Sequence, residues 1–170
     1  MTRGSPPRRR RLPRSSRSLA RLLAASCLAL ATAAAHAVLG GRAPAIAADS
    51  NRLAGTRRIE PAAANADVQV HVIVLADGSQ VREFVGPAGI VFAVAWSTRF
   101  KPRLETLLGT YTATYADAAA RSARGPGVRH AMTIAGDDLV VHAAAHLNAH
   151  GGLAYAPSLV PAGVRIDDLR

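Results

Sequence analysis

The sequence predicts an α+β fold in which a small antiparallel β-sheet, formed by a meander and C-terminal strands, packs against one amphipathic helix. The longest run of β-branched and aromatic residues, 68–96, is interrupted by two turn motifs and predicts the meander. The next segment carries apolar residues at spacings of three and four, as one face of a helix does. Short apolar segments separated by glycine, proline and aspartate then follow. These features predict a single domain over residues 68–170.

The meander contains three predicted strands, at residues 68–75, 80–85 and 90–96. In the first two, valines alternate with other residues, which is typical of half-buried strands. Residues 77–78 are Asp-Gly, which favours a tight hairpin because glycine adopts positive φ at no steric cost. Residues 86–89, Gly-Pro-Ala-Gly, predict the second turn.

The predicted core joins the third strand to the helix. The helix begins near Pro102, which suits the first helical position, and ends within residues 120–123. Gly109 lies inside it and costs about 1 kcal/mol relative to alanine, which indicates a close approach to a neighbouring element. The third strand has one face of large side chains and one of small side chains, and either offers a surface to the helix. We expect the large face to pack, which brings together Phe92, Val94, Trp96, Leu104, Leu107 and Leu108.

The C-terminal part contains two short predicted strands, at residues 128–134 and 153–155. Between them, residues 139–150 fit two conformations. Their alanines favour a helix, whereas the Leu-Val-Val with which they begin favours a strand. We favour the strand. The glycines at 151–152 are predicted to interrupt the chain, and residues 160–166 to form an extended tail.

Residues 1–37 are predicted to be a signal peptide that is removed on export. Arginine-rich residues 1–21 precede a 14-residue apolar stretch, 22–35, and Ala-His-Ala at 35–37 matches a cleavage site. The apolar stretch is shorter than the ~20 residues that a membrane-spanning helix needs. The paired arginines are compatible with twin-arginine export, but their distance from the apolar stretch favours the general secretory route. We therefore expect a soluble mature protein in the periplasm or outside the cell.

Residues 38–67 are predicted to be a flexible linker. They are rich in alanine, glycine, proline, asparagine and arginine and hold few large apolar side chains. Such a segment buries too little apolar surface to offset the entropy lost on ordering. The folded domain is therefore expected to begin at residue 68.

The charge of the chain does not indicate a nucleic-acid partner. The formal net charge of +10 includes eight arginines within residues 1–37, and no acidic residue precedes Asp49. Without residues 1–37, 13 basic and 11 acidic side chains remain, a net charge of +2. A nearly neutral domain lacks the basic surface that binds phosphate backbones.

Cys27 is the only cysteine, and it lies in the apolar stretch of the signal peptide. The mature chain therefore has no disulfide, thiol nucleophile or cysteine metal ligand. The residues before Cys27 resemble a lipoprotein processing site, which leaves lipid anchoring as an alternative. Leucine stands one position too early and Ser26 is a poor residue before the cysteine, so we favour a signal-peptide cysteine without lipid.

Several segments together resemble an uncharacterised family of bacterial exported proteins, the domain of unknown function 2844. The motifs are Val-Leu-Gly-Gly at 38–41, the run from Gly-Pro-Ala-Gly at 86–89 to Ala-Trp at 95–96, Ala-Tyr-Ala-Pro at 154–157, and Leu-Val-Pro-Ala-Gly-Val at 159–164. The resemblance implies a small exported α+β protein and supplies no activity, ligand or catalytic residue. The sequence departs from the family pattern at residues 143–145, where alanines stand in place of glycines.

Catalytic and cofactor motifs are absent from the sequence. It contains no nucleophile elbow, phosphate loop, dinucleotide fingerprint or zinc-protease motif, so we assign no catalytic residue and no cofactor. Arg82 and Glu83 are expected to point to opposite faces of a strand as exposed charge partners, and His71 to be an isolated surface or cross-strand group.

One histidine cluster remains as a candidate metal site: His142, His146 and His150, spaced by four residues. On a helix these three imidazoles would share one face and could hold zinc. On a strand, residues four apart lie about 13 Å from each other, too far to share one ion. Because we favour the strand, we predict no metal site.

The sequence therefore favours a non-catalytic exported module that binds an unidentified protein or envelope partner. Two alternatives stay open: a metal-binding protein or metal-dependent hydrolase that uses the three histidines, and a lipid-anchored envelope protein attached through Cys27.

The cleavage site predicts that the mature protein begins at Val38. N-terminal sequencing of protein recovered outside the cytoplasm should read Val-Leu-Gly-Gly. A blocked, lipid-modified start at Cys27 would instead establish the lipoprotein alternative.

Overall fold

The computed structural model describes Met1 and residues 38–62, 65–122 and 131–169. Most of the predicted signal peptide, residues 2–37 with Cys27, lies outside the described residues. Among the helices that the structure describes, none has the length and hydropathy that crossing a membrane requires.

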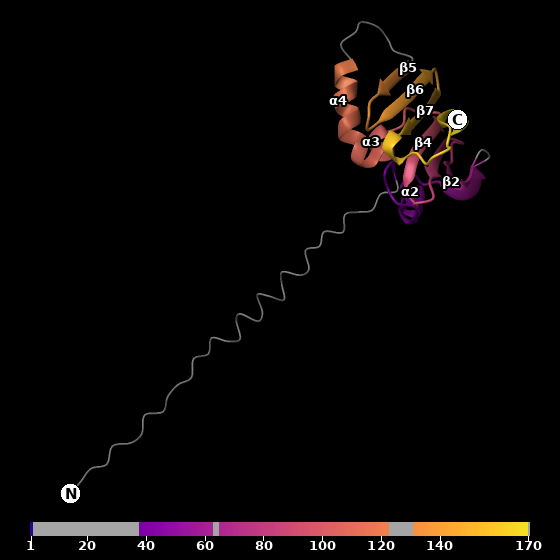
Figure 1. The fold of residues 1–170 in the computed structure, drawn as a ribbon. Helices are drawn as coiled ribbons and strands as arrows, with labels where there is room; N and C mark the ends of the chain where they lie inside the picture. The colour runs from indigo at the N-terminus through magenta and orange to yellow at the C-terminus, as the bar shows by residue number, and fades with distance from the viewer. Residues whose placement is uncertain (2–37, 63–64, 123–130, 170) are drawn as a thin grey trace. The chain divides into compact units, whose positions relative to one another are not determined.

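The described residues form a seven-stranded antiparallel sheet with the strand order β1-β2-β3-β4-β7-β6-β5. The C-terminal hairpin therefore joins the N-terminal meander through the pairing of β4 with β7, and Figure 1 shows β5, β6, β7, β4 and β2 one after another in this order. The predicted α+β class is confirmed. The strands are β1 (Thr56–Ala62), β2 (Asn65–Val74), β3 (Gln80–Val85), β4 (Val91–Thr98), β5 (Ala131–Ala135), β6 (Val140–His146) and β7 (Ala149–Tyr155).

The predicted meander corresponds to β2, β3 and β4. Its first turn contains Gly78 at a φ of 82°, and the Ser79 amide donates a hydrogen bond of 2.9 Å to the Asp77 carboxylate. Its second turn contains Gly89 at a φ of 69°. Both turn predictions are confirmed, because each glycine adopts the positive φ for which it was identified.

The predicted core is confirmed except for Phe92. Val94, Trp96, Leu107 and Leu108 are buried in one cluster, and Leu104 packs against it. The prediction for Phe92 is wrong because the register shifts: Val85 pairs with Val91 while Phe84 pairs with Ala93. The extra residue of this β-bulge turns Phe92 to the other face. There its ring centroid lies 6.3 Å from that of Phe84.

The helical layer is interrupted where one continuous helix was predicted. α3 (Leu104–Leu108) ends before Gly109, a 3₁₀ turn η2 (Gly109–Tyr111) follows, and α4 (Thr112–Ser122) continues the layer. Gly109 has a φ of 52° and a ψ of −120°, a conformation open to glycine and strained for other residues. The end of α4 at Ser122 agrees with the prediction.

The prediction of a flexible linker is wrong for the described residues between 38 and 67. They contain a 3₁₀ turn η1 (Ala43–Ala45), the helix α2 (Ile46–Arg52), strand β1 and the start of β2. Val38, Leu39 and Ile46 are buried, with Leu39 and Ile46 fully shielded from solvent. The segment is mostly small and polar, yet these few large side chains reach the core, and β1 gains its order by pairing with β2.

Backbone hydrogen bonds tie the start of this segment between α3 and β4. The Leu39 amide donates to the Leu107 carbonyl at 3.2 Å, and the Gly40 amide donates to the Val91 carbonyl at 2.8 Å. The Val91 amide in turn donates to the Gly41 carbonyl at 2.9 Å. Val38 thereby lies against Gly109, where a Cβ atom would stand 2.1 Å from Val38 Cγ2. This contact explains the break between α3 and α4.

The C-terminal glycines do not interrupt the chain as predicted. Gly151 and Gly152 lie inside β7 and pair with both β4 and β6. The predicted strand at 128–134 is observed as β5, and residues 128–130 lie outside the described residues. After β7 the chain forms two 3₁₀ turns, η3 (Pro157–Leu159) and η4 (Ile166–Leu169), in place of a fully extended tail.

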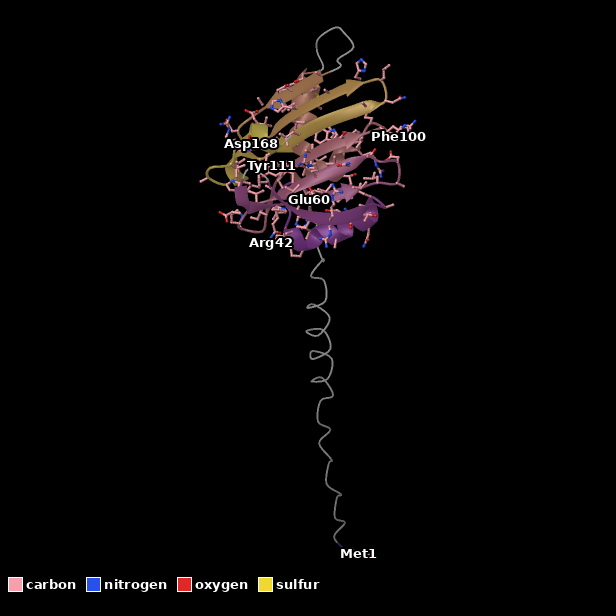
Figure 2. All side chains as sticks on the ribbon, turned by 90° about the vertical axis from the view of Figure 1, so that its right-hand side faces the viewer. Met1, Arg42, Glu60, Phe100, Tyr111 and Asp168 are labelled. Atoms are coloured by element: carbon pink, nitrogen blue, oxygen red, sulfur yellow. The ribbon has the colours of Figure 1, made fainter. Side chains whose placement is uncertain are left out.

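The sheet has two differently covered faces. The helix face packs against α2, α3 and α4; its buried sheet residues include Ile73, Val81, Val94, Trp96 and Val141. The tail face packs against the C-terminal segment; its buried sheet residues include Val70, Val72, Phe84, Ala93 and Leu153. Asp168 of that segment lies at the opposite end of the strands from the exposed Phe100 (Figure 2). The tail therefore covers one end of its face and leaves the end near Phe100 open.

Substitution of Gly109 by alanine should destabilise the domain by roughly 2–6 kcal/mol. A strained backbone contributes about 1–3 kcal/mol, and overpacking against Val38 contributes about 1–3 kcal/mol. The double variant Val38→Ala/Gly109→Ala should lose less stability than the two single variants together, because the methyl group then has room. Urea unfolding measures the free energy of unfolding of the two single variants and of the double variant.

Gly78→Ala is the matched control. It imposes positive φ on alanine in open space, since nothing lies within 4 Å of its Cβ position. Its loss of stability should therefore reflect only the cost of placing alanine at a positive φ. Strict additivity of Val38→Ala and Gly109→Ala would show that Val38 does not cause the break between the helices.

Candidate functional site

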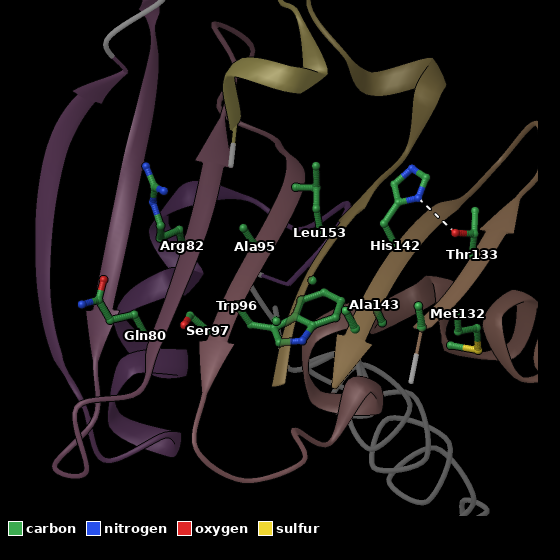
Figure 3. Close-up of a pocket in the computed structure, with 14 residues that line it drawn as sticks. Gln80, Arg82, Ala95, Trp96, Ser97, Met132, Thr133, His142, Ala143 and Leu153 are labelled. Atoms are coloured by element: carbon green, nitrogen blue, oxygen red, sulfur yellow. Dashed lines mark hydrogen bonds between the residues drawn. The ribbon is translucent and has the colours of Figure 1, made fainter. Parts of the chain in front are cut away.

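An open trough lies on the tail face, and residues of five strands line it. One row of residues crosses it in register from β3 to β5. In this row Arg82 pairs with Ala95, Ala95 with Leu153, Leu153 with His142, and His142 with Thr133. Figure 3 shows Arg82 at one end of this row and His142 with Thr133 at the other.

A second row lies beside the first, two residues along each strand. Gln80 pairs with Ser97, Ser97 with Gly151, Gly151 with Ala144, and Ala144 with Ala131. Except for Gln80, its members are small, so the sheet has a hollow where the tail does not cover it. The two rows line a cavity of about 510 Å³. This volume lies within the roughly 300–1,000 Å³ range of small-molecule sites.

Two adjacent glycines shape the sheet at this point. A Cβ atom on Gly152 would lie 2.1 Å from Trp96 Cζ2, so on the helix face the indole occupies the place of a side chain. A Cβ atom on Gly151 would come no closer than 3.7 Å to another group, the Trp96 carbonyl oxygen. Gly152 therefore admits Trp96 into the core, and Gly151 keeps the trough open on the opposite face.

Among the described residues that line the trough, Arg82 carries the one fixed positive charge. Arg82 is half-buried, and its guanidinium carbon lies 5.5 Å from the centroid of the Phe84 ring. Among the described residues, neither an ion pair nor a hydrogen bond holds this guanidinium. The described residues that line the cavity include no aspartate or glutamate. The Arg82 end of the trough is consequently electropositive.

His142 and Thr133 form the far end of the trough. The Thr133 hydroxyl and His142 Nδ1 are 3.4 Å apart and form a hydrogen bond whose direction depends on the imidazole tautomer. The pair is exposed and joins β5 to β6 through side chains. It gives the trough a polar end opposite Arg82.

The three histidines of the predicted cluster do not share a face. The predicted strand is confirmed: β6 ends at His146, and Leu147 turns the chain at a φ of 50° into β7. His142 and His146 lie on the tail face, whereas His150 pairs with Ala145 and lies on the helix face. Within the residues that the structure describes, no three histidine, cysteine, aspartate or glutamate side chains are grouped so that they could hold a metal ion.

A second polar group is buried on the helix face, beneath α2. Glu83 and His71 are cross-strand partners, 1% and 3% exposed. Both ring nitrogens of His71 and Oε2 of Glu83 have no hydrogen-bond partner among the described residues. Asp49 of α2 is 3% exposed and pairs with Arg52 at 2.8 Å.

Burial sets the protonation of this group. Desolvation, with a further contribution from the Asp49 charge, raises the pKa of Glu83 to about 9, although Arg57 opposes the rise. Desolvation and the Arg57 charge lower the pKa of His71 below its ordinary 6.5. Both side chains are therefore neutral at neutral pH, which lowers the cost of burying them.

Sequence reasoning placed Arg82 and Glu83 on opposite faces, which is confirmed, but it expected Glu83 to be exposed, which is wrong. Glu83 shares its face with Val81 and Val85, both buried. That alternation was the available signal that Glu83 points into the core. The trough itself had no sequence signal, since its rows combine the consecutive strands β3 and β4 with the distant strands β5, β6 and β7.

The shift of Glu83 predicts a pH dependence of stability. The unfolded carboxyl ionises near its ordinary pKa of 4.5, whereas the folded one keeps its proton until about pH 9. The native state then binds more protons, so the free energy of unfolding should fall as pH rises from about 7 to about 9. His71 titrates below this window in both states. Urea unfolding at a series of pH values measures the slope.

Glu83→Gln should remove this part of the pH dependence, because glutamine keeps the shape and does not ionise. Glu60→Gln, at an exposed ion pair with Arg58, is the control and should keep the wild-type slope. Equal slopes in wild type and Glu83→Gln would contradict a protonated Glu83 in the native state.

Comparison with known proteins gives one match. No curated protein and no solved structure matches the chain. The model of a family described as "Protein of unknown function (DUF2844)" matches residues 35–169. This match covers all seven strands and also residues 38–67, in agreement with their place in the folded domain. The chain therefore belongs to the DUF2844 family of proteins of unknown function.

Proposed function

We propose that this protein is exported and acts in the cell envelope or outside the cell as a non-catalytic module that binds a small ligand in the trough. The observation that carries the binding role is the open cavity of about 510 Å³ at the uncovered end of the tail face. Folded domains rarely leave an apolar sheet face open unless something binds there.

The export part of the proposal is supported by the sequence. Residues 1–37 have the basic, apolar and small-residue regions of a signal peptide, in that order. Val38 follows the cleavage site directly and, among the described residues, is the first to lie in the core. Cleavage at this position would remove the basic segment and leave the whole folded domain.

The groups that line the trough support binding over catalysis. Ser97 and His142 are its nucleophile and base candidates, but they lie on β4 and β6, with β7 between them. Two interstrand spacings of ~4.8 Å separate their backbones by about 10 Å. His142 is held by Thr133, and no carboxylate lines the cavity to orient or activate it. A polar group at each end of an apolar floor suits orientation of a bound molecule.

Native mass spectrometry of the mature protein recovered from the cells that export it tests this proposal. The wild-type protein should carry a noncovalent small molecule that denaturation releases. Gly151→Val should carry none, because the added side chain fills the trough, and its Cβ atom would come no closer than 3.7 Å to another group.

Ala135→Val is the matched control. It adds a branched side chain to an exposed position of β5 that does not line the trough, and it should keep the ligand. A wild-type protein without bound ligand, or a Gly151→Val variant that retains it, would contradict the proposal.

A further inference from the structure

We infer that the trough takes a molecule with an apolar body and a single carboxylate, and that Arg82 binds the carboxylate. The inference rests on the proposed function and adds the chemical class of the ligand. It follows from the charge at one end of the trough, the apolar floor beside it and the way in which Arg82 is held.

A contact with an aromatic ring positions the Arg82 guanidinium, and no acidic side chain among the described residues neutralises it. Its guanidinium is placed by Phe84, two residues along the same strand face, at 5.5 Å. Arg58 on β1 offers a contrast on the same face, because Glu60 pairs with it at 2.6 Å. Arg82 has no such partner among the described residues. A half-buried cation in a cavity without acidic side chains attracts an anion more strongly than a fully solvated one does.

The floor beside Arg82 is apolar. Ala95 and Leu153 are 8% and 2% exposed and lie between Arg82 and His142. Three interstrand spacings of ~4.8 Å give the row from β3 to β6 a width of about 14 Å. An apolar body laid across β4 and β7 from Arg82 would rest on this floor, and the apolar surface removed from water would be mostly that of the bound molecule.

One guanidinium favours a carboxylate over other anions. Its planar fork matches the two oxygens of a carboxylate in a bidentate pair. A phosphate group or nucleic-acid backbone is usually held by several basic groups or a glycine-rich backbone cradle, and the described residues of the trough include one arginine. A cationic ligand is disfavoured, because it would meet Arg82 with no acidic side chain to compensate.

Octanoate and octanamide are the matched probes, since they share one apolar chain and differ in charge. Isothermal titration of the mature protein should show octanoate binding about tenfold or more tightly than octanamide, as expected for a charge-assisted hydrogen bond. Arg82→Met, which keeps an apolar stem, should weaken octanoate to the level of octanamide. Arg82→Lys should give an intermediate affinity, since it keeps the charge and loses the fork.

Arg121→Met, at an exposed position of α4, changes the net charge equally and should leave octanoate affinity at the wild-type value. Equal affinities of the two probes, or an unchanged octanoate affinity in Arg82→Met, would overturn carboxylate recognition. Loss of both affinities in Gly151→Val would then still support a binding trough. Absence of binding by both probes would overturn this ligand class. Native mass spectrometry of the wild-type protein and of Gly151→Val would then decide separately whether the trough binds a small molecule.

Discussion

The pairing of β4 with β7 depends on Trp96 lying over Gly152, and the rest of the architecture depends on that pairing. It is the junction through which the N-terminal meander and the C-terminal hairpin become one sheet. A side chain at residue 152 would meet the indole at 2.1 Å, so the two strands approach with a buried tryptophan between them only because glycine stands there. The neighbouring Gly151 faces the other way and leaves the hollow of the trough. Two adjacent glycines thus permit the core on one face and the candidate site on the other.

The N-terminal segment completes the core in a similar way, because one of its side chains occupies the space that a glycine leaves free. Gly109 has no side chain and adopts a conformation strained for other residues, and Val38 fills the space beside it. The amide of Leu39 then satisfies a carbonyl at the end of α3, where helical carbonyls lack intrahelical partners. The same contacts therefore interrupt the helix, order the N-terminal segment and fix the start of β4.

The two charged residues of β3, Arg82 and Glu83, have different surroundings because successive residues of a strand point to opposite faces. Glu83 faces α2, loses its hydration and keeps its proton, whereas Arg82 is half-buried and faces the trough. Neutral Glu83 and His71 fit a closed layer, and the guanidinium of Arg82, which has no ion-pair partner among the described residues, fits the binding surface that we propose. The same alternation gives the sheet a structural face and a candidate binding face.

Sequence alone determined the local elements. The alternation within 68–96, the glycines at 78 and 89 and the strand preference of Leu-Val-Val at 139–141 each act through neighbouring residues, and each element formed as predicted. Contacts between distant segments decided the rest. The ordering of residues 38–62 depends on α3 and β2, the bulge at Phe92 on its register with β3, and Gly151 and Gly152 on Trp96. The trough could not be predicted, because its two rows exist only once five strands are in register, and strand pairing is set by side chains far apart in the chain.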